Sequence, residues 1–173
     1  MGGARRELKV EVLRRGGEDR DALVEHVVRE VCRGLMSSRL CNTLRITVEC
    51  RATTLASGKH GKATWTPVVD ARSKHYRIVL RRDLDEGTLV RTIAHELRHV
   101  EQYARGRLRH GTKGRVGGRF WRPDTGPATF HPYASTDYRT SPWEVEAREA
   151  EPLGATIARL RRSRAAREER CAA

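Results

Sequence analysis

Aromatic residues and long apolar runs are both scarce in this 173-residue chain. Phe, Trp and Tyr make up 5% of the sequence and hydrophobic residues 38%, which suffices for one modest core but not for two full-sized domains. No stretch approaches the ~20 consecutive apolar residues of a membrane-spanning helix. The first residues carry charges with no apolar run behind them, so no signal-peptide pattern is visible and we expect a cytoplasmic protein.

Cysteine is also sparse, and its spacing excludes the common cysteine-based zinc sites. The chain contains Cys32, Cys41, Cys50 and Cys171, with no CxxC pair and no Cys/His ribbon spacing. We expect the first three to be ordinary, partly buried thiols in a reducing compartment.

Acidic residues are outnumbered by basic ones. Lys and Arg number 35 against 22 Asp and Glu, a formal net charge of +13. From Arg105 through Arg122 every charged residue is basic. Such a charge favours polyanionic partners. A net positive charge of this size can also result from Arg-rich codon usage. Charge alone therefore does not establish nucleic-acid binding.

The hydrophobic pattern predicts an α+β domain over residues 1–152, with a small mixed sheet and a strong helix. Alternating apolar residues predict strands, and apolar residues at helical spacing predict helices. The predicted strands are 7–13, 44–50, 75–81 and a short one near 64–69, and the predicted helices are 20–36 and 86–105.

The remaining segments are less regular in sequence. Residues 107–140 are rich in Gly, Pro and Arg and predict a long basic loop. A helix begins at Ser141, and Pro152 and Gly154 are expected to end it. Residues 153–173 are then an Arg-rich helix or tail.

An HExxH motif, His95-Glu96-Leu97-Arg98-His99, lies within the predicted 86–105 helix. Residues four apart share a helix face with Cβ atoms about 6 Å apart, so two imidazoles can bind one zinc ion. Glu96 lies beside that pair, where it can reach a metal-bound water. The alternative is a pair of exposed histidines with Glu96 in surface salt bridges.

A zinc site that keeps one position open for water needs a third protein ligand. No histidine follows at the metzincin spacing, where Arg105 stands instead. Glu144 and Glu146 are candidates, but they point to nearly opposite sides of a helix, so only one can face the metal. Glu144 also fits a capping box that begins at Ser141, and both roles stay open.

These two segments resemble small gluzincin-type zinc metallopeptidases, most closely the SprT-like and phage-borne predicted peptidases. The resemblance rests on HELxHVxQ at 95–102 and on PWExEA at 142–147, and it spans roughly residues 75–150. It implies a zincin-like fold and a Zn²⁺ cofactor held by His95, His99 and Glu144, with Glu146 as the fallback.

The resemblance also implies a mechanism and a substrate class. Glu96 would act as general base on a zinc-bound water that attacks a peptide bond. The strand at 76–80 would lie at the cleft edge and pair with an extended polypeptide. Trp121 and Trp143 are expected to be core anchors. Four residues are candidates for stabilising the oxyanion: His110, His131, Tyr133 and Tyr138.

A second interpretation is a nucleic-acid-associated basic protein with a structural or degenerate metal site. The basic stretch 105–122 and the Arg-rich C-terminal segment support it. Structural zinc sites usually have four protein ligands, often cysteines, and this motif offers Glu96 beside an open site. That difference favours catalysis. A protease recruited to acidic or DNA-bound substrates would combine both interpretations.

Overall fold

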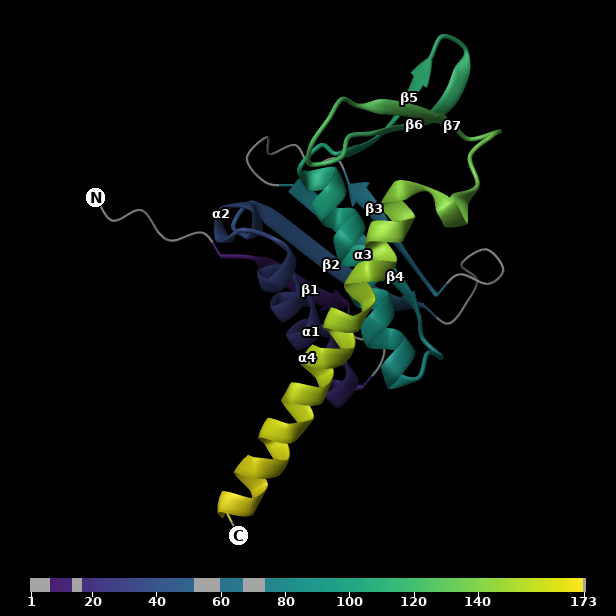
Figure 1. Ribbon diagram of the computed structural model, residues 1–173. Helices are drawn as coiled ribbons and strands as arrows, with labels where there is room; N and C mark the ends of the chain where they lie inside the picture. Colours follow the sequence, from purple (N-terminus) through teal and green to yellow (C-terminus); the bar gives the residue numbers. More distant parts are fainter. Residues whose placement is uncertain (1–6, 14–16, 52–59, 67–73, 173) are drawn as a thin grey trace, which may run out of the picture.

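The computed structural model describes residues 7–13, 17–51, 60–66 and 74–172, and it confirms the predicted α+β class (Figure 1). In chain order the elements are β1 Lys9–Leu13, α1 Glu18–Leu35, α2 Ser38–Cys41, β2 Leu44–Arg51, β3 Gly61–Thr66, β4 Lys74–Arg81, α3 Glu86–Ala104, β5 Leu108–Lys113, β6 Val116–Trp121, β7 Thr129–Pro132, the 3₁₀ turn η1 Tyr138–Thr140, and α4 Pro142–Ala172.

Four strands form the larger sheet in the order β1-β2-β4-β3. β1, β2 and β4 are parallel, whereas β3 is antiparallel to β4 and forms an edge. The prediction that the strand at 76–80 lies at the cleft edge is therefore wrong, because β4 is paired on both sides. β3 overlaps the short strand predicted near 64–69, of which residues 67–69 lie outside the described residues.

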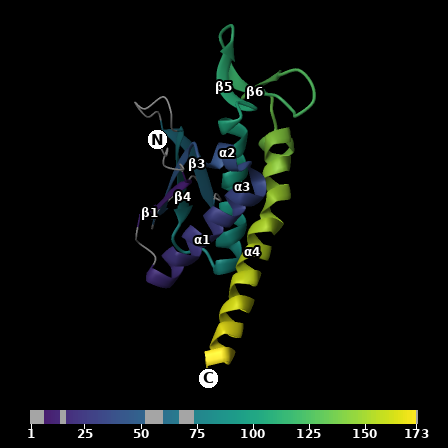
Figure 2. The ribbon, with the colours of Figure 1, turned by 90° about the vertical axis from the view of Figure 1, so that its left-hand side faces the viewer.

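The helices cover the sheet in layers. Viewed edge-on, the sheet is followed by α1 and α3, and α4 lies beyond them along α3 (Figure 2). The core lies between the sheet and the first helical layer, where aliphatic side chains are fully buried. It includes Ile46 and Ile78 from the sheet, Val27 from α1, and Ile93 and Leu97 from α3.

A second sheet occupies much of the segment 107–140, so the prediction of one long loop there is wrong. β5, β6 and β7 form an antiparallel sheet in chain order. Leu108 and Trp121 from its inner face are buried against Trp143 of α4, which confirms both tryptophans as core anchors. The pattern was not visible in the sequence because glycine and basic residues occupy most other positions of these strands.

α4 continues without a break, so the helix end predicted at Pro152 and Gly154 is wrong, and the proposed boundary at residue 152 falls inside the helix. Pro152 cannot donate its backbone hydrogen bond. Packing compensates for this lost hydrogen bond, because α4 contacts α3 close to Pro152. A Cβ atom on Gly154 would lie 2.2 Å from the carbonyl oxygen of Val90. The absent side chain therefore allows the two helices to approach.

Other sequence expectations concern thiols and membranes. Cys32, Cys41 and Cys50 are buried free thiols, and burial raises the pKa of each one. In the described part of the chain, no helix combines the length and apolar character that a membrane crossing requires.

Replacing Gly154 by Ala tests the close contact between α3 and α4. In an exposed helix interior this change stabilises by about 1 kcal/mol, but here the new methyl meets the Val90 carbonyl. We expect destabilisation by about 1–3 kcal/mol, measured as a lower Tm. The control is Ser163→Ala on an exposed part of the same helix, which should leave Tm unchanged or slightly higher. A Gly154→Ala protein as stable as the control would contradict the contact.

Candidate metal centre

Helix α3 carries the HExxH motif and is fixed at both ends. The Asp85 side chain accepts a hydrogen bond from the backbone N–H of Thr88 at 2.9 Å and caps the first turn. At the other end Gly106 adopts a φ of 69°, and the N–H of Arg107 bonds to the carbonyl of Gln102 at 2.8 Å. This is the geometry of a glycine-terminated helix. The helix predicted at 86–105 is confirmed.

The two histidines of the motif meet one carboxylate from α4. The imidazole rings of His95 and His99 lie 4.9 Å apart between centroids. Nε2 of His95 is 3.3 Å from Glu144 Oε2, and Nε2 of His99 is 3.2 Å from Oε1. One ligand-type atom from each residue lies within 4.8 Å of the others. His99 is 7% exposed and Glu144 is 3% exposed, which argues against a pair of surface histidines.

Glu144 does not form the predicted capping box. Its carboxylate faces the two imidazoles of α3, while its backbone N–H donates to the carbonyl of Ser141 at 3.0 Å. The Ser141 hydroxyl donates instead to the carbonyl of Tyr138 at 2.7 Å. Of the two roles open at this position, the geometry matches a metal ligand.

Glu146 lies elsewhere. Its Oε2 accepts a hydrogen bond from the Gln102 amide at 3.2 Å, and its other oxygen pairs with Arg107. Within the described chain it is not part of the cluster formed by His95, His99 and Glu144. Glu146 therefore acts as a support behind the cluster.

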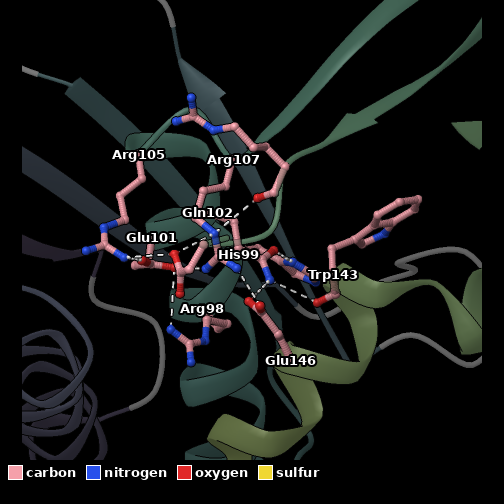
Figure 3. Close-up of polar contacts among 10 residues, drawn as sticks. Arg98, His99, Glu101, Gln102, Arg105, Arg107, Trp143 and Glu146 are labelled. Atoms are coloured by element: carbon pink, nitrogen blue, oxygen red, sulfur yellow. Dashed lines mark hydrogen bonds and ion pairs between the residues drawn. The ribbon is translucent and has the colours of Figure 1, made fainter. Parts of the chain in front are cut away.

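The amide of Gln102 fixes the ring of His99 (Figure 3). Its Nε2 lies 3.0 Å from the main-chain oxygen of Trp143 and also contacts Glu146, and both partners are acceptors. The amide oxygen therefore faces Nδ1 of His99, 2.9 Å away, so Nδ1 carries the proton and donates it. In the neutral ring this leaves the lone pair on Nε2, the atom that faces Glu144.

Glu151 plays the corresponding part for His95. Its Oε1 lies 3.1 Å from Nδ1 of His95, so a carboxylate accepts the proton at that ring position as well. Glu151 was missed at the sequence level. The available signal was its position seven residues after Glu144, two helical turns further on the same face of α4. Metal-binding histidines in general have such a partner at the second nitrogen.

A network of buried ion pairs links the C-terminal end of α3 to the second sheet. Glu101 is fully buried and lies 3.1 Å from Arg105, 3.5 Å from Arg98 and 3.6 Å from Arg107 (Figure 3). Burial raises the pKa of Glu101 despite these three cations. The guanidinium of Arg107 also stacks over Trp121 at 4.7 Å. The end of α3 and the start of β5 are thereby held together.

The negative charge of Glu144 makes the space between the three side chains of the cluster favourable for a cation. Burial alone would raise the pKa of Glu144, but the nearby imidazoles of His95 and His99 and the hydroxyl of Tyr138 hold it well below its usual range. Burial lowers the pKa of His95, yet Glu144 and Glu96 raise it overall. Glu144 is thus an anion at neutral pH.

These residues fit a divalent metal ion. Glu144 Oε1 is buried and accepts no hydrogen bond of good geometry from the described residues, although His99 Nε2 is close. Since both Nδ1 atoms face acceptors, the lone pairs of two neutral rings and of this carboxylate converge. In a tetrahedral zinc site two ligand atoms lie about 3.4 Å apart, close to the separations seen here. Imidazole and carboxylate donors suit zinc.

The structure distinguishes the four candidates for oxyanion stabilisation by what each side chain contacts. His110 Nδ1 and the Tyr133 hydroxyl contact each other at 2.5 Å. The ring of His131 packs edge-on against the indole of Trp143 in α4, with ring centroids 5.1 Å apart. Tyr138 is the one whose hydroxyl interacts with Glu144.

Comparison with known proteins adds no family assignment. No protein-family model, curated protein or solved structure matches this chain. The resemblance to gluzincin-type and SprT-like peptidases therefore stays a prediction, and function is inferred from the site.

The choice between Glu144 and Glu146 can be tested by metal content. We expect Glu144→Ala to lose bound zinc, because it removes a converging donor, and Glu146→Ala to keep it. Native mass spectrometry of the two purified variants beside the unmodified protein gives the result. Loss of zinc from Glu146→Ala alone would reverse the assignment.

The role of Gln102 is tested by Gln102→Met, which keeps the volume but removes the acceptor at Nδ1 of His99. We expect zinc affinity to fall about 10–100-fold, measured by competition with a chelator. Arg98→Gln on the same helix, which leaves the histidine contacts intact, is the control. Equal affinities in both variants would show that Gln102 does not orient His99.

Proposed function

We propose that this protein is a zinc-dependent metallopeptidase that hydrolyses peptide bonds. The observation that carries the proposal is the convergence of His95, His99 and Glu144, with Glu96 beside them on α3. The same conclusion follows from the resemblance to small gluzincin-type peptidases. A reducing compartment such as the cytoplasm suits its three buried free thiols.

His95, His99 and Glu144 would hold the ion. Bound zinc acts as a Lewis acid that activates water and polarises a peptide carbonyl. The carboxylate of Glu151 and the amide of Gln102 keep the two imidazoles oriented for this task. A neutral tautomer fixed in advance reduces the cost of ligand reorganisation.

Glu96 is suited to the proton transfers. It is 6% exposed and lies outside the three-residue cluster, yet its charge reaches His95 and helps to raise that pKa. A carboxylate at this position accepts a proton from the attacking water and returns it to the leaving amine. The proposed general base is therefore adjacent to the metal ligands without competing for the ion.

Tyr138 is suited to oxyanion stabilisation. Its hydroxyl interacts with Glu144, and burial raises its pKa, so it is a protonated donor at neutral pH. A hydroxyl beside the ligand set can donate a hydrogen bond to the substrate oxygen as negative charge develops.

An extended substrate would pair with β3, the edge strand next to Glu96. A Cβ on Gly61 would lie 2.7 Å from a methyl of Thr92 and 3.1 Å from Glu96 Oε1, so glycine lets the strand approach the motif. The other side of β3 is already paired with β4. No other strand of the described residues pairs with its outer side, which can offer backbone groups to a polypeptide.

A second candidate function is nucleic-acid binding. The observation that favours it is the final part of α4, which projects beyond the body (Figure 1). Most basic side chains on this part of the helix are exposed. The exposed arginines there include Arg159, Arg164, Arg167 and Arg170. In this alternative the metal would be structural, and affinity for DNA would fall steeply with salt.

Glu96→Gln separates these functions. We expect this variant to retain zinc, because Glu96 is not a ligand, and to cleave fluorescein-labelled casein at least 10²-fold more slowly, since the general base is lost. Glu149→Gln, on the exposed side of α4, is the control and should cleave normally.

Two outcomes would contradict the peptidase proposal. One is undiminished cleavage by Glu96→Gln, which would show that the activity arises elsewhere. The other is metal retention with no cleavage by any form, together with salt-dependent binding to DNA, which would support the second candidate.

A further inference from the structure

A row of three basic side chains crosses the second sheet. His110 of β5 lies directly opposite Arg119 of β6, and Arg119 lies opposite His131 of β7. Directly opposed residues share one face of an antiparallel sheet, so the three side chains form a continuous rung. None of these three side chains belongs to the cluster of candidate metal ligands.

The rung lies on the face that covers α3 and α4. Two residues along each strand, and so on the same face, Leu108 and Trp121 are buried with Trp143 of α4. His110 contacts the hydroxyl of Tyr103 of α3 at 2.8 Å, and His131 packs against Trp143. The rung therefore faces the helices that carry the candidate metal ligands.

Arg119, at the centre of the rung, lies close to the metal cluster. Its guanidinium is 5.3 Å from the ring centroid of Trp143 and 6.0 Å from that of Tyr138. Trp143 immediately precedes Glu144, and the Tyr138 hydroxyl interacts with the same carboxylate. Two aromatic rings thus hold this cation beside the site.

Arg119 has no carboxylate partner in the described part of the chain, in contrast with Arg107. Arg107 is paired with Glu146, Glu101 and Asp124. For Arg119 no acidic residue among those described lies within 4.0 Å, and its Nε is buried without a hydrogen-bond acceptor. A partly buried cation without an anionic partner is costly unless a ligand supplies an anion.

The surroundings of Arg119 add positive charge on this side of the site. Burial lowers the pKa of His110, and the charges of Arg119 and Lys62 lower it further. Lys62 belongs to β3, the strand proposed to pair with substrate. A bound polypeptide would therefore pass between two cations, one from each sheet.

We propose that Arg119 binds a carboxylate of the polypeptide substrate near the scissile bond. This inference rests on the proposed peptidase function and specifies its substrate class as peptides with an acidic group at that position. The planar guanidinium can donate two parallel hydrogen bonds to a carboxylate while it stays within cation–π distance of the two aromatic rings. The carboxylate belongs either to an Asp or Glu side chain or to a free C-terminus.

Binding and cleavage of one peptide pool test the inference. Fluorescein-labelled casein peptides are compared with the same pool after all carboxyl groups are converted to amides, using zinc-loaded Glu96→Gln and fluorescence anisotropy. We expect the untreated pool to bind about 10–100-fold more tightly, and Arg119→Gln in the same background to lose that preference. Arg119→Lys should recover part of it, because the charge remains.

Arg109→Gln is the matched control. Arg109 is exposed on the opposite face of the second sheet, across from Phe120, and its removal changes the net charge equally. It should keep the preference for carboxylates. A synthetic pool with amidated C-termini but free Asp and Glu distinguishes the two sources. Loss of the preference in that pool indicates a C-terminal carboxylate, and its retention indicates an acidic side chain.

Equal binding of the untreated and amidated pools would overturn the inference, as would a preference that survives in Arg119→Gln. Selective loss of single-stranded DNA binding in Arg119→Gln, with peptide binding unchanged, would assign the rung to nucleic acid. Mapping the cleavage sites of the active protein by mass spectrometry tests the proposed function separately. Cleavage without enrichment of acidic groups rejects only the role of Arg119, whereas absence of cleavage rejects the peptidase.

Discussion

The approach of α4 to α3 is the constraint on which the candidate site depends. Two histidines on one helix form a pair of donors, but the carboxylate between them comes from Glu144, more than forty residues later in the chain. The helices can lie close enough because Gly154 places bare backbone against the carbonyl of Val90. The same packing brings Glu151 to His95.

Burial then makes this arrangement chemically specific. An anionic carboxylate out of contact with water needs a compensating charge. Without a metal, protonation of His95 provides such a charge, and the directions of the pKa changes of His95 and Glu144 agree with this. Acceptors at both Nδ1 positions leave the Nε2 atoms available to an ion instead. The site thus balances the charge of Glu144 by protons or by a metal, and metal binding displaces protons.

The local features of the site were predictable from sequence, and the tertiary ones were not. The HExxH spacing depends on helical periodicity, which the sequence displays directly. Periodicity left Glu144 and Glu146 both open, and the preference for Glu144 came from the resemblance to gluzincin-type peptidases. The second sheet was hidden because Leu108 and Trp121 are the main apolar anchors among many Gly and Arg residues. Glycine commonly marks the end of a helix, so the sequence suggested an end at Gly154. The contact of Gly154 with Val90 is visible only in three dimensions. The roles of Glu146 and Glu151 likewise depend on how two helices lie against each other.

X-ray absorption at the zinc K-edge of the purified, zinc-loaded protein tests the central claim most directly. The account predicts one zinc ion per chain with two imidazole nitrogens and one carboxylate oxygen at about 2.0–2.2 Å, plus an oxygen from water. A protein that takes up no zinc would contradict the account, as would an ion ligated by sulfur or by a single imidazole.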